Sequence, residues 1–248
     1  MQTRTVLITG ASTGIGFAAA RAFLARGANL VLNSRDDGRL QAAFRALGEP
    51  SGVALVPGDV SDRAVGRRMV DAALEAFGRV DVLVNNAGVF APKPFLEVEE
   101  ADLERYLAVN LKGTFFTSQA AIAAMLKTGG GAIVNVGTVL TGHAIGGFPA
   151  TAPVASKGAI DALTVQLAAE FGRQGIRVNT LAPGIVRTPI HARNGIDNVD
   201  DLAGLALLDR VGEDAEAAEA IVHLATAGFT TGHIYPLDGG HAAGHHLN

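Results

Sequence analysis

Short runs of apolar residues recur along the chain, and longer stretches with helical periodicity separate them. Most of these runs are unbroken rather than alternating, which is typical of strands that helices cover on both faces. The pattern therefore predicts an α/β fold, a doubly wound parallel sheet of about seven strands with helices on both faces. The predicted strands are residues 6–8, 30–32, 53–56, 82–84, 132–134, 178–182 and 233–237.

The stretches between these runs are rich in Ala, Leu, Glu and Arg, which favour helices. Ser61-Asp62 offers an N-cap for the third stretch, and Gly27, Gly48 and Gly78 stand where glycine commonly ends a helix. The expected helices are residues 14–26, 37–47, 62–77, 101–127, 154–173 and 214–226.

No repeat, low-complexity tract or proline-rich linker divides the 248 residues, so we expect a single domain over residues 1–248. One long irregular stretch, about 184–213, follows the sixth predicted strand. Because ligands bind beyond the carboxyl ends of the strands in sheets of this type, we expect this stretch to be a substrate loop.

Composition excludes several classes of protein. The chain has no cysteine and a formal net charge of −4. A disulfide framework, thiolate metal sites and a cysteine nucleophile are therefore excluded, and a nucleic-acid partner is not expected. No segment reaches the roughly 18 apolar residues of a membrane span, and the N-terminus lacks the apolar core of a signal peptide. We expect a cytoplasmic protein with no membrane partner and no metal site.

The first predicted strand runs into a glycine-rich segment, Thr9-Gly10-Ala11-Ser12-Thr13-Gly14-Ile15-Gly16, which opens the first predicted helix. Glycines let the backbone pass close to a pyrophosphate, and a helix N-terminus presents N–H groups with partial positive charge. A spaced glycine triplet alone also fits a tight turn. Its position between a strand and a helix favours dinucleotide binding.

Together with this segment, motifs along nearly the whole chain resemble those of the short-chain dehydrogenase/reductase family, whose glycine motif is TGxxxGxG. The further matches are Asp59, Asn85-Asn86-Ala87-Gly88, Asn110 in VNLKG, Thr138, Lys157 in ASKGA, Asn179 in RVNTLAPG, Pro183-Gly184 with Thr188, and Leu237-Asp238-Gly239-Gly240. The resemblance implies a Rossmann-like fold and an oxidoreductase that takes NAD(P)(H). The implied cofactor-binding residues are Thr9, Gly10, Ser12, Thr13, Gly14, Ile15, Gly16, Ser34, Arg35, Asp59, Val60, Asn86, Ala87, Gly88, Lys157, Pro183, Gly184, Ile185 and Thr188.

The resemblance implies that Asp59 contacts the adenine of the dinucleotide. It also implies that Ile185 and Thr188 hold the nicotinamide amide. Asn86 is implied to line the dinucleotide. For Asn86 and its neighbour Asn85, hydrogen bonding at the end of the strand is an equal alternative.

The choice between NAD and NADP is made at the end of the second strand, where a carboxylate binds the ribose 2′-hydroxyl or a guanidinium binds the 2′-phosphate. Ser34 occupies the place of the family's acidic residue and Arg35 follows it, which favours NADP(H) over NAD(H). Asp36 is the alternative carboxylate, but its place before a predicted helix also makes it an N-cap. Thr13 stands where many NADP-dependent relatives have a basic residue, which weakens the preference.

Members of the family transfer hydride between the nicotinamide and a carbonyl or alcohol. Lys157 corresponds to the lysine that binds the nicotinamide ribose, Thr138 to the residue that holds the substrate oxygen, and Asn110 to the asparagine that organises a water beside the lysine. The catalytic tyrosine, four residues before the lysine, is replaced by Pro153. The alternative spacing of the enoyl-reductase branch, seven residues before the lysine, falls on Ala150.

We expect the loss of the tyrosine to slow hydride transfer rather than abolish it. A positioned acid or base contributes about 10²–10⁴-fold, whereas orientation of the reactants contributes roughly 7–11 kcal/mol. His143, five residues after Thr138, is a candidate for the substitute proton donor, although a solvent-facing position is commoner for a loop histidine. Tyr106, one helical turn before Asn110, is a weaker candidate.

The remaining rings are expected to have other roles. Tyr235 belongs to the last predicted strand and is expected to be structural. His191 is a weak candidate for contact with substrate. His241, His245 and His246 are expected to form a solvated or subunit-interface tail.

Two functions remain open. One is an oxidoreductase that acts on a small carbonyl or alcohol, or on an imine or activated alkene, with a non-standard proton donor. The other is a dinucleotide-binding protein without turnover that serves as a cofactor sensor or partner. We favour the first, because Thr138 has no other obvious task.

The resemblance also implies a homotetramer, or a homodimer, formed through the helices around 106–110 and 157–170. A fairly apolar small substrate is indicated by Ile190, Ile196, Leu202, Leu205, Leu207 and Leu208.

Overall fold

Seven parallel strands form one sheet in the order β3-β2-β1-β4-β5-β6-β7, as predicted. The strands are β1 (Thr5–Ile8), β2 (Asn29–Ser34), β3 (Val53–Pro57), β4 (Val82–Asn85), β5 (Gly131–Val136), β6 (Ile176–Pro183) and β7 (Ile234–Leu237). This computed structural model describes residues 3–246. The domain predicted over 1–248 therefore includes four residues, 1, 2, 247 and 248, that lie outside the described part.

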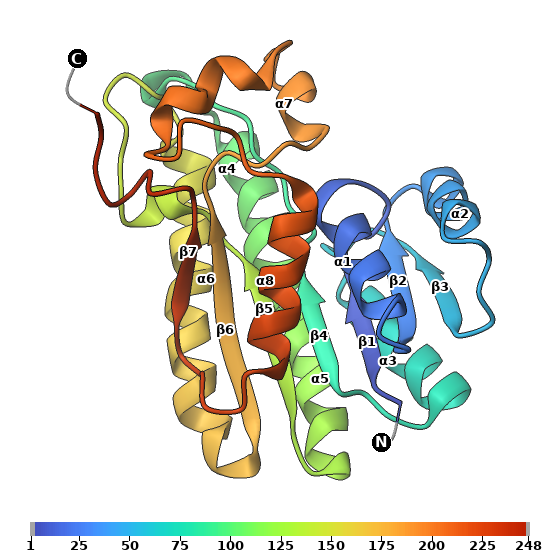
Figure 1. The fold of residues 1–248 in the computed structure, drawn as a ribbon. Coiled ribbons are helices and arrows are strands. Elements are labelled where there is room, and N and C mark those ends of the chain that lie inside the picture. The colour runs from blue at the N-terminus through green and yellow to red at the C-terminus, as the bar shows by residue number, and fades with distance from the viewer. Residues whose placement is uncertain (1–2, 247–248) are drawn as a thin grey trace.

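Helices cover both faces of the sheet (Figure 1). They are α1 (Gly14–Leu24), α2 (Asp37–Ala46), α3 (Arg63–Phe77), α4 (Glu100–Tyr106), α5 (Gly113–Thr128), α6 (Thr151–Phe171), α7 (Ile190–Arg193) and α8 (Asp214–Thr226). Side chains alternate along each strand. Val6 and Ile8 of β1 therefore belong to a core with α1 and α8, while Leu7 belongs to a second core with α3 and α5. Burial on both faces is the reason that the strands have unbroken apolar runs.

The stretch predicted as one helix over 101–127 is divided, so that prediction is corrected. α4 ends at Tyr106, a π-helical turn spans Leu107–Lys112, and α5 begins at Gly113. Within the wider turn, the Asn110 amide bonds the backbone of Val89 on the loop after β4. The stretch has helical propensity throughout, so sequence periodicity does not reveal the local widening.

Several helix ends confirm the predicted capping residues. Asp62 is the N-cap of α3, and its carboxylate accepts a backbone N–H at 2.9 Å. Asp36 caps α2 in the same way, at 2.9 Å. Gly78 ends α3 in the left-handed conformation, with φ 75°. These caps place the loops after β2 and β3 at the same edge of the sheet.

α6 is the longest helix, with 21 residues. It begins at Thr151 rather than at the predicted 154, and Pro153 lies in its first turn, where the backbone N–H has no intrahelical acceptor. Within residues 3–246, neither α6 nor any other helix combines the length and the hydropathy that a membrane crossing requires.

A chain of buried polar side chains crosses the sheet from β4 to β6. Asn85 donates to Ser118 and to Asn135, both at 2.9 Å. Asn135 in turn donates to Thr164 at 2.9 Å, and the hydroxyls of Thr164 and Thr180 are 2.7 Å apart. The amide nitrogen of Asn85 thus makes hydrogen bonds inside the protein, which agrees with the predicted alternative of strand-end hydrogen bonding.

We expect Asn135→Leu to lower the free energy of unfolding by about 1–3 kcal/mol, because the buried Asn85 and Thr164 each lose a hydrogen-bond partner. Urea denaturation measures the change. Gln41→Ala, on the exposed surface of α2, is the control and is expected to stay within about 0.5 kcal/mol of the parent. Equal stability of Asn135→Leu and the parent would show that the buried chain is not a stabilising network.

Candidate functional site

A cavity of about 720 Å³ extends along the carboxyl ends of the strands. Its lining runs from Gly10 after β1 to His241 after β7. The strand order reverses between β1 and β4, the place where sheets of this type bind ligands. The predicted site residues in the lining are Gly10, Ser12, Thr13, Gly14, Ile15, Ser34, Arg35, Asp59, Val60, Asn86, Ala87, Gly88, Thr138, Lys157, Pro183, Gly184, Ile185 and Thr188. Those outside it are Thr9, Gly16, Asn110 and His143.

The glycine loop after β1 has the shape of an anion cradle. Gly10 has φ +63°, and a Cβ atom there would stand 2.9 Å from the Cα of Ala87. A Cβ atom on Gly16 would collide with the amide of Asn86 and with the carbonyl of Gly10. Thr13 is the N-cap of α1 but makes no side-chain capping bond. The first N–H groups of α1 are therefore left to a ligand, and phosphate is the group that such helix ends bind.

Thr9 and Asn86 join the loops after β1 and β4. The Thr9 hydroxyl accepts from the N–H groups of Asn86 and Ala87, both at 3.0 Å. The Asn86 amide donates to the carbonyls of Thr9 and Gly10, also at 3.0 Å. Thr9 thus holds the two loops together without lining the cavity. Asn86 makes these strand-end bonds and also lines the cavity.

The end of β2 forms a polar, basic corner of the cavity. The hydroxyls of Ser12 and Ser34 are 2.9 Å apart, and Arg35 lies beside them in the lining. Arg39, on the first turns of α2, also lines this corner, although no sequence motif indicated this residue. The Asp36 carboxylate accepts from the backbone N–H of Arg39 at 2.9 Å, which confirms its role as an N-cap.

Lys157 presents a buried ammonium at the opposite end. Its exposed fraction is 7%, and its Nζ donates to the carbonyl of Val136 at 2.6 Å. Burial lowers the pKa of Lys157 to about 8, while the negative charge of Asp161 opposes this shift. Asp161 lies one helical turn further along α6, and burial raises its own pKa. The sequence motif indicated Lys157 but not this charged neighbour.

Asn110 supports this end of the cavity without lining it. Its Oδ1 accepts from Val89 N at 2.8 Å, and its Nδ2 donates to Val89 O at 3.0 Å and to the Ser156 hydroxyl at 2.8 Å. A Cβ atom on Gly88 would stand 3.1 Å from Lys157 Nζ and 3.2 Å from Asn110 Oδ1. Asn110 therefore lies next to Lys157, but the amide is committed to holding the loop after β4.

Among residues 3–246, no tyrosine lines the cavity. The Tyr106 hydroxyl donates to the carbonyl of Ala91 at 2.8 Å, and Tyr235 packs in β7 against the rings of His223 and His233. Pro153 is buried in the first turn of α6 and does not line the cavity. Thr138 is in the lining, and its hydroxyl accepts from Leu140 N at 3.3 Å.

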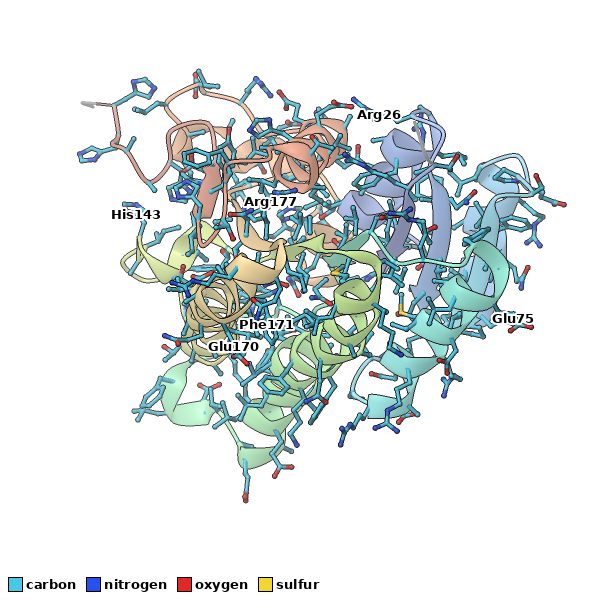
Figure 2. The ribbon with its side chains drawn as sticks, turned by 90° about the horizontal axis from the view of Figure 1, so that it is seen from below. Arg26, Glu75, His143, Glu170, Phe171 and Arg177 are labelled. Carbon is cyan, nitrogen blue, oxygen red and sulfur yellow. The ribbon has the colours of Figure 1, made fainter. Side chains whose placement is uncertain are left out.

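The predicted histidines lie in different environments. His143 is not in the cavity lining, and Figure 2 shows it at the periphery of the molecule, which agrees with the alternative of a loop histidine. His245 and His246 are exposed, but His241 is 4% exposed and lines the cavity, so the prediction of a solvated tail is wrong for His241. The physical reason is that the turn after β7 folds back under the substrate loop, where Leu208 N donates to Gly239 O at 3.0 Å. The adjacent glycines Gly239 and Gly240, both with positive φ, are the sequence signal for that turn.

The substrate loop is mostly irregular, as predicted, but contains α7 and a 3-10 segment, Val199–Leu205. Arg187 ties the loop together through ion pairs with Asp200 at 2.5 Å and Glu213 at 3.1 Å. Leu207 and Leu208 do not line the cavity. Its apolar lining at this end is formed by Phe90, Val139, Ile145, Phe148, Ile190, Ile196, Leu202 and Leu205, and His191 lies among them with its Nε2 bonded to Val186 O at 2.8 Å.

Several known proteins are similar to this chain in sequence and architecture. The model of the family described as Enoyl-(Acyl carrier protein) reductase matches residues 10–242. Galactitol 2-dehydrogenase (L-tagatose-forming) of Cereibacter sphaeroides is 38% identical over an alignment of 239 residues that covers 94% of this chain and 93% of that protein. L-rhamnose 1-dehydrogenase (NAD(P)(+)) of Sphingomonas sp. (strain SKA58) is 37% identical over an alignment of 256 residues, gaps included, that covers 97% of this chain and 96% of that protein. The crystal structure of a gluconate 5-dehydrogenase from Burkholderia cenocepacia J2315, in complex with NADP and tartrate, is 31% identical and has a TM-score of 0.89, covering 98% of this chain and 97% of that chain.

We expect Asp161→Asn to lower the pKa of Lys157 below its value of about 8, because the substitution removes the negative charge that favours the ammonium. ¹³C NMR of labelled lysine side chains, followed against pH, measures this shift. Asp71→Asn, on the exposed surface of α3, is the control and is expected to leave Lys157 unchanged. A pKa of Lys157 that stays constant or rises in Asp161→Asn would contradict the assigned charge interaction.

Proposed function

Because the chain belongs to the short-chain dehydrogenase/reductase family, we propose that it is an NADP(H)-dependent oxidoreductase that acts on a small carbonyl or alcohol. The observation that carries this proposal is the shared cavity: Gly10 and Ser12–Ile15 of the anion cradle line one continuous space with Thr138 and Lys157. The relatives named above, which act on galactitol, rhamnose and gluconate by their names, support an oxidoreductase.

The residues fit a dinucleotide. Ser12, Gly14 and Ile15 would hold the pyrophosphate at the uncapped start of α1, and Asp59 would lie at the adenine. Ile185 and Thr188 would hold the nicotinamide amide, and Lys157 the adjoining ribose. Bound NADP(H) would supply or accept the hydride, and the protein would orient it toward the apolar end of the cavity.

The basic corner at the end of β2 supports NADP(H) over NAD(H). Arg35 and Arg39 both line this corner, and Ser34 stands where an acid would repel a 2′-phosphate. The Asp36 carboxylate is engaged by the N-terminus of α2, which reduces its competition for the ribose. The NADP in the neighbouring gluconate 5-dehydrogenase supports this proposal, whereas the name of the rhamnose dehydrogenase gives NAD(P)(+) and favours neither cofactor.

We expect NADPH to raise the Tm more than NADH does, because only a ligand that binds the folded state stabilises it and only NADPH has the 2′-phosphate. The double substitution Arg35→Ala with Arg39→Ala is expected to weaken NADPH binding by about 10–100-fold, the worth of lost charged hydrogen bonds, and to leave NADH binding unchanged. Isothermal titration measures both affinities.

Arg45→Ala, in the last turn of α2 and outside the cavity lining, is the matched control for that double variant. A loss of NADH affinity equal to the loss of NADPH affinity would contradict a 2′-phosphate site. If neither nucleotide raises the Tm of the parent, the dinucleotide site itself is refuted.

The protein would hold the substrate oxygen between the Thr138 hydroxyl and the Lys157 ammonium. A positive charge at Lys157 stabilises the negative charge that develops on that oxygen during hydride transfer. Pro153 has no proton to donate, so turnover depends on another group. The alternative function, a dinucleotide-binding protein without turnover, would need the same cradle but no proton transfer.

We expect the parent protein to oxidise NADPH when small ketones are supplied as substrates. Thr138→Val is expected to lower kcat/KM by about 10–100-fold, because one hydrogen bond to the substrate oxygen is lost. Thr226→Val, at the end of α8, is the control. Pro153→Tyr places a phenol one turn before Lys157 and is expected to raise turnover by at least about tenfold if it folds normally. Tight NADPH binding without turnover of any substrate would favour the cofactor-sensor alternative.

The apolar lining favours a small and mainly apolar substrate. Phe90 and Phe148 stack with their ring centroids 6.3 Å apart, and Leu202 and Leu205 of the substrate loop belong to the same lining. Burial of apolar surface is the main gain for a ligand in such a pocket. The names of the relatives give polyhydroxy compounds as substrates, whereas the lining of this cavity is apolar.

A second apolar surface supports assembly into a homotetramer or homodimer. Leu111, Phe115, Phe116 and Leu163 form it on the outer face of α5 and α6, where Phe115 is 44% exposed. Contiguous apolar surface of this kind is typical of protein interfaces. We propose that this face is covered by another copy of the chain.

A further inference from the structure

His241 is a buried ring at the same end of the cavity as Thr138. Its backbone N–H donates to Asp238 O at 3.2 Å, and Asp238 packs on Gly184, where a Cβ atom would stand 2.8 Å from the Asp238 Cβ. On the other side, its ring meets the ring of His143 edge to face, with centroids 5.1 Å apart. His143 N donates to Val139 O at 3.0 Å, on the turn that Thr138 begins. His241 is therefore held between the segment after β5 and the segment after β6.

The Nδ1 atom of His241 has no hydrogen-bond partner among the described residues, although it is buried. A buried polar atom without a partner costs free energy, and Nδ1 is closed off from the cavity as well as from solvent. The backbone of this region is occupied by its own turn, since Asp238 accepts from Gly240 N and Ala242 N. The ring nitrogen that is left for a molecule in the cavity is therefore Nε2, which makes no hydrogen bond to the described residues.

The other titratable candidates are less suitable. His191 lines the cavity, but its Nε2 is bonded to Val186 O at 2.8 Å. Asp161 lies outside the lining, and its negative charge acts on the pKa of Lys157. His143 also lies outside the lining, although its ring packs against that of His241.

We propose that His241 exchanges a proton with the substrate oxygen, in the place of the tyrosine that this chain lacks. This inference rests on the proposed oxidoreductase function. In alcohol oxidation, neutral His241 takes the hydroxyl proton, the carbon–hydrogen bond breaks, and its hydride passes to bound NADP⁺, leaving a carbonyl compound and NADPH. In the reverse direction, protonated His241 gives its proton to the carbonyl oxygen as hydride arrives from NADPH.

The charges around His241 favour the direction of alcohol oxidation near neutral pH. Burial lowers the pKa of His241, His143 lowers it further, and Asp238 raises it. A lowered pKa keeps the imidazole neutral at pH 7, the form that accepts a proton. The oxidation rate is therefore expected to fall as the pH drops through the pKa of His241, and the reduction rate to fall as the pH rises through it.

The first test compares His241→Ala, His241→Gln and the control His223→Gln, on the exposed face of α8, in alcohol oxidation with NADP⁺. We expect kcat to fall about 100-fold or more in both His241 variants, with the Kd for NADP⁺ unchanged. Added imidazole should restore part of the rate in His241→Ala but not in His241→Gln. A rate within threefold of the parent in both His241 variants overturns the proposal, and an equal Tm in all proteins excludes misfolding.

The second test does not depend on turnover. ¹³C-labelled histidine, with His241 assigned by the signal lost in His241→Gln, is titrated by NMR with and without NADP⁺. The positive nicotinamide ring should lower the pKa of His241, whereas adenosine 2′,5′-bisphosphate, which has no nicotinamide, should not change it. An unchanged pKa with NADP⁺ places His241 away from the reacting centre and overturns the proposal. Absence of turnover in the parent with every alcohol and ketone instead refutes the proposed function, and with it the proton transfer.

Discussion

The close approach of the loops after β1 and β4 is the constraint on which the rest of the site depends. Gly10 and Gly16 permit this approach, and the hydrogen bonds between Thr9 and Asn86 hold it. The two strands are neighbours at the point where the strand order reverses, so the helices that follow them leave on opposite sides and a space opens between them. The uncapped start of α1 points into this space, which is why an anion site and a cavity occur together.

Lys157 links the cavity to the core at the other end. A buried ammonium is costly unless it is bonded, and here Val136 O accepts from it while Asp161 supplies an opposing charge. The π-helical turn at Asn110 holds the loop after β4 against the same group. The position of Lys157 is therefore determined by β5, α6 and the loop after β4 together.

The proposed function places proton transfer outside the first turn of α6. Pro153 in that turn is buried and lies outside the cavity lining, whereas His241, on the turn after β7, lines the cavity. A proton donor is defined by where its atom lies and not by its place in the chain, so another segment can supply it.

The sequence by itself determined the sheet, the glycine loop and the basic corner, because apolar runs, glycine spacing and capping residues act over a few neighbouring positions. Asp36 and Asp62 as caps, and Ser34 with Arg35 at the corner, follow from such local rules. Only the tertiary structure decided that His241 and not His143 lines the cavity, that Asn110 turns its amide to Val89, and that Arg39 and Asp161 join the site. These placements depend on contacts between segments far apart in the chain. The fold-back of the turn after β7, for instance, is fixed by the substrate loop packed against it, and no pattern along the chain records that contact.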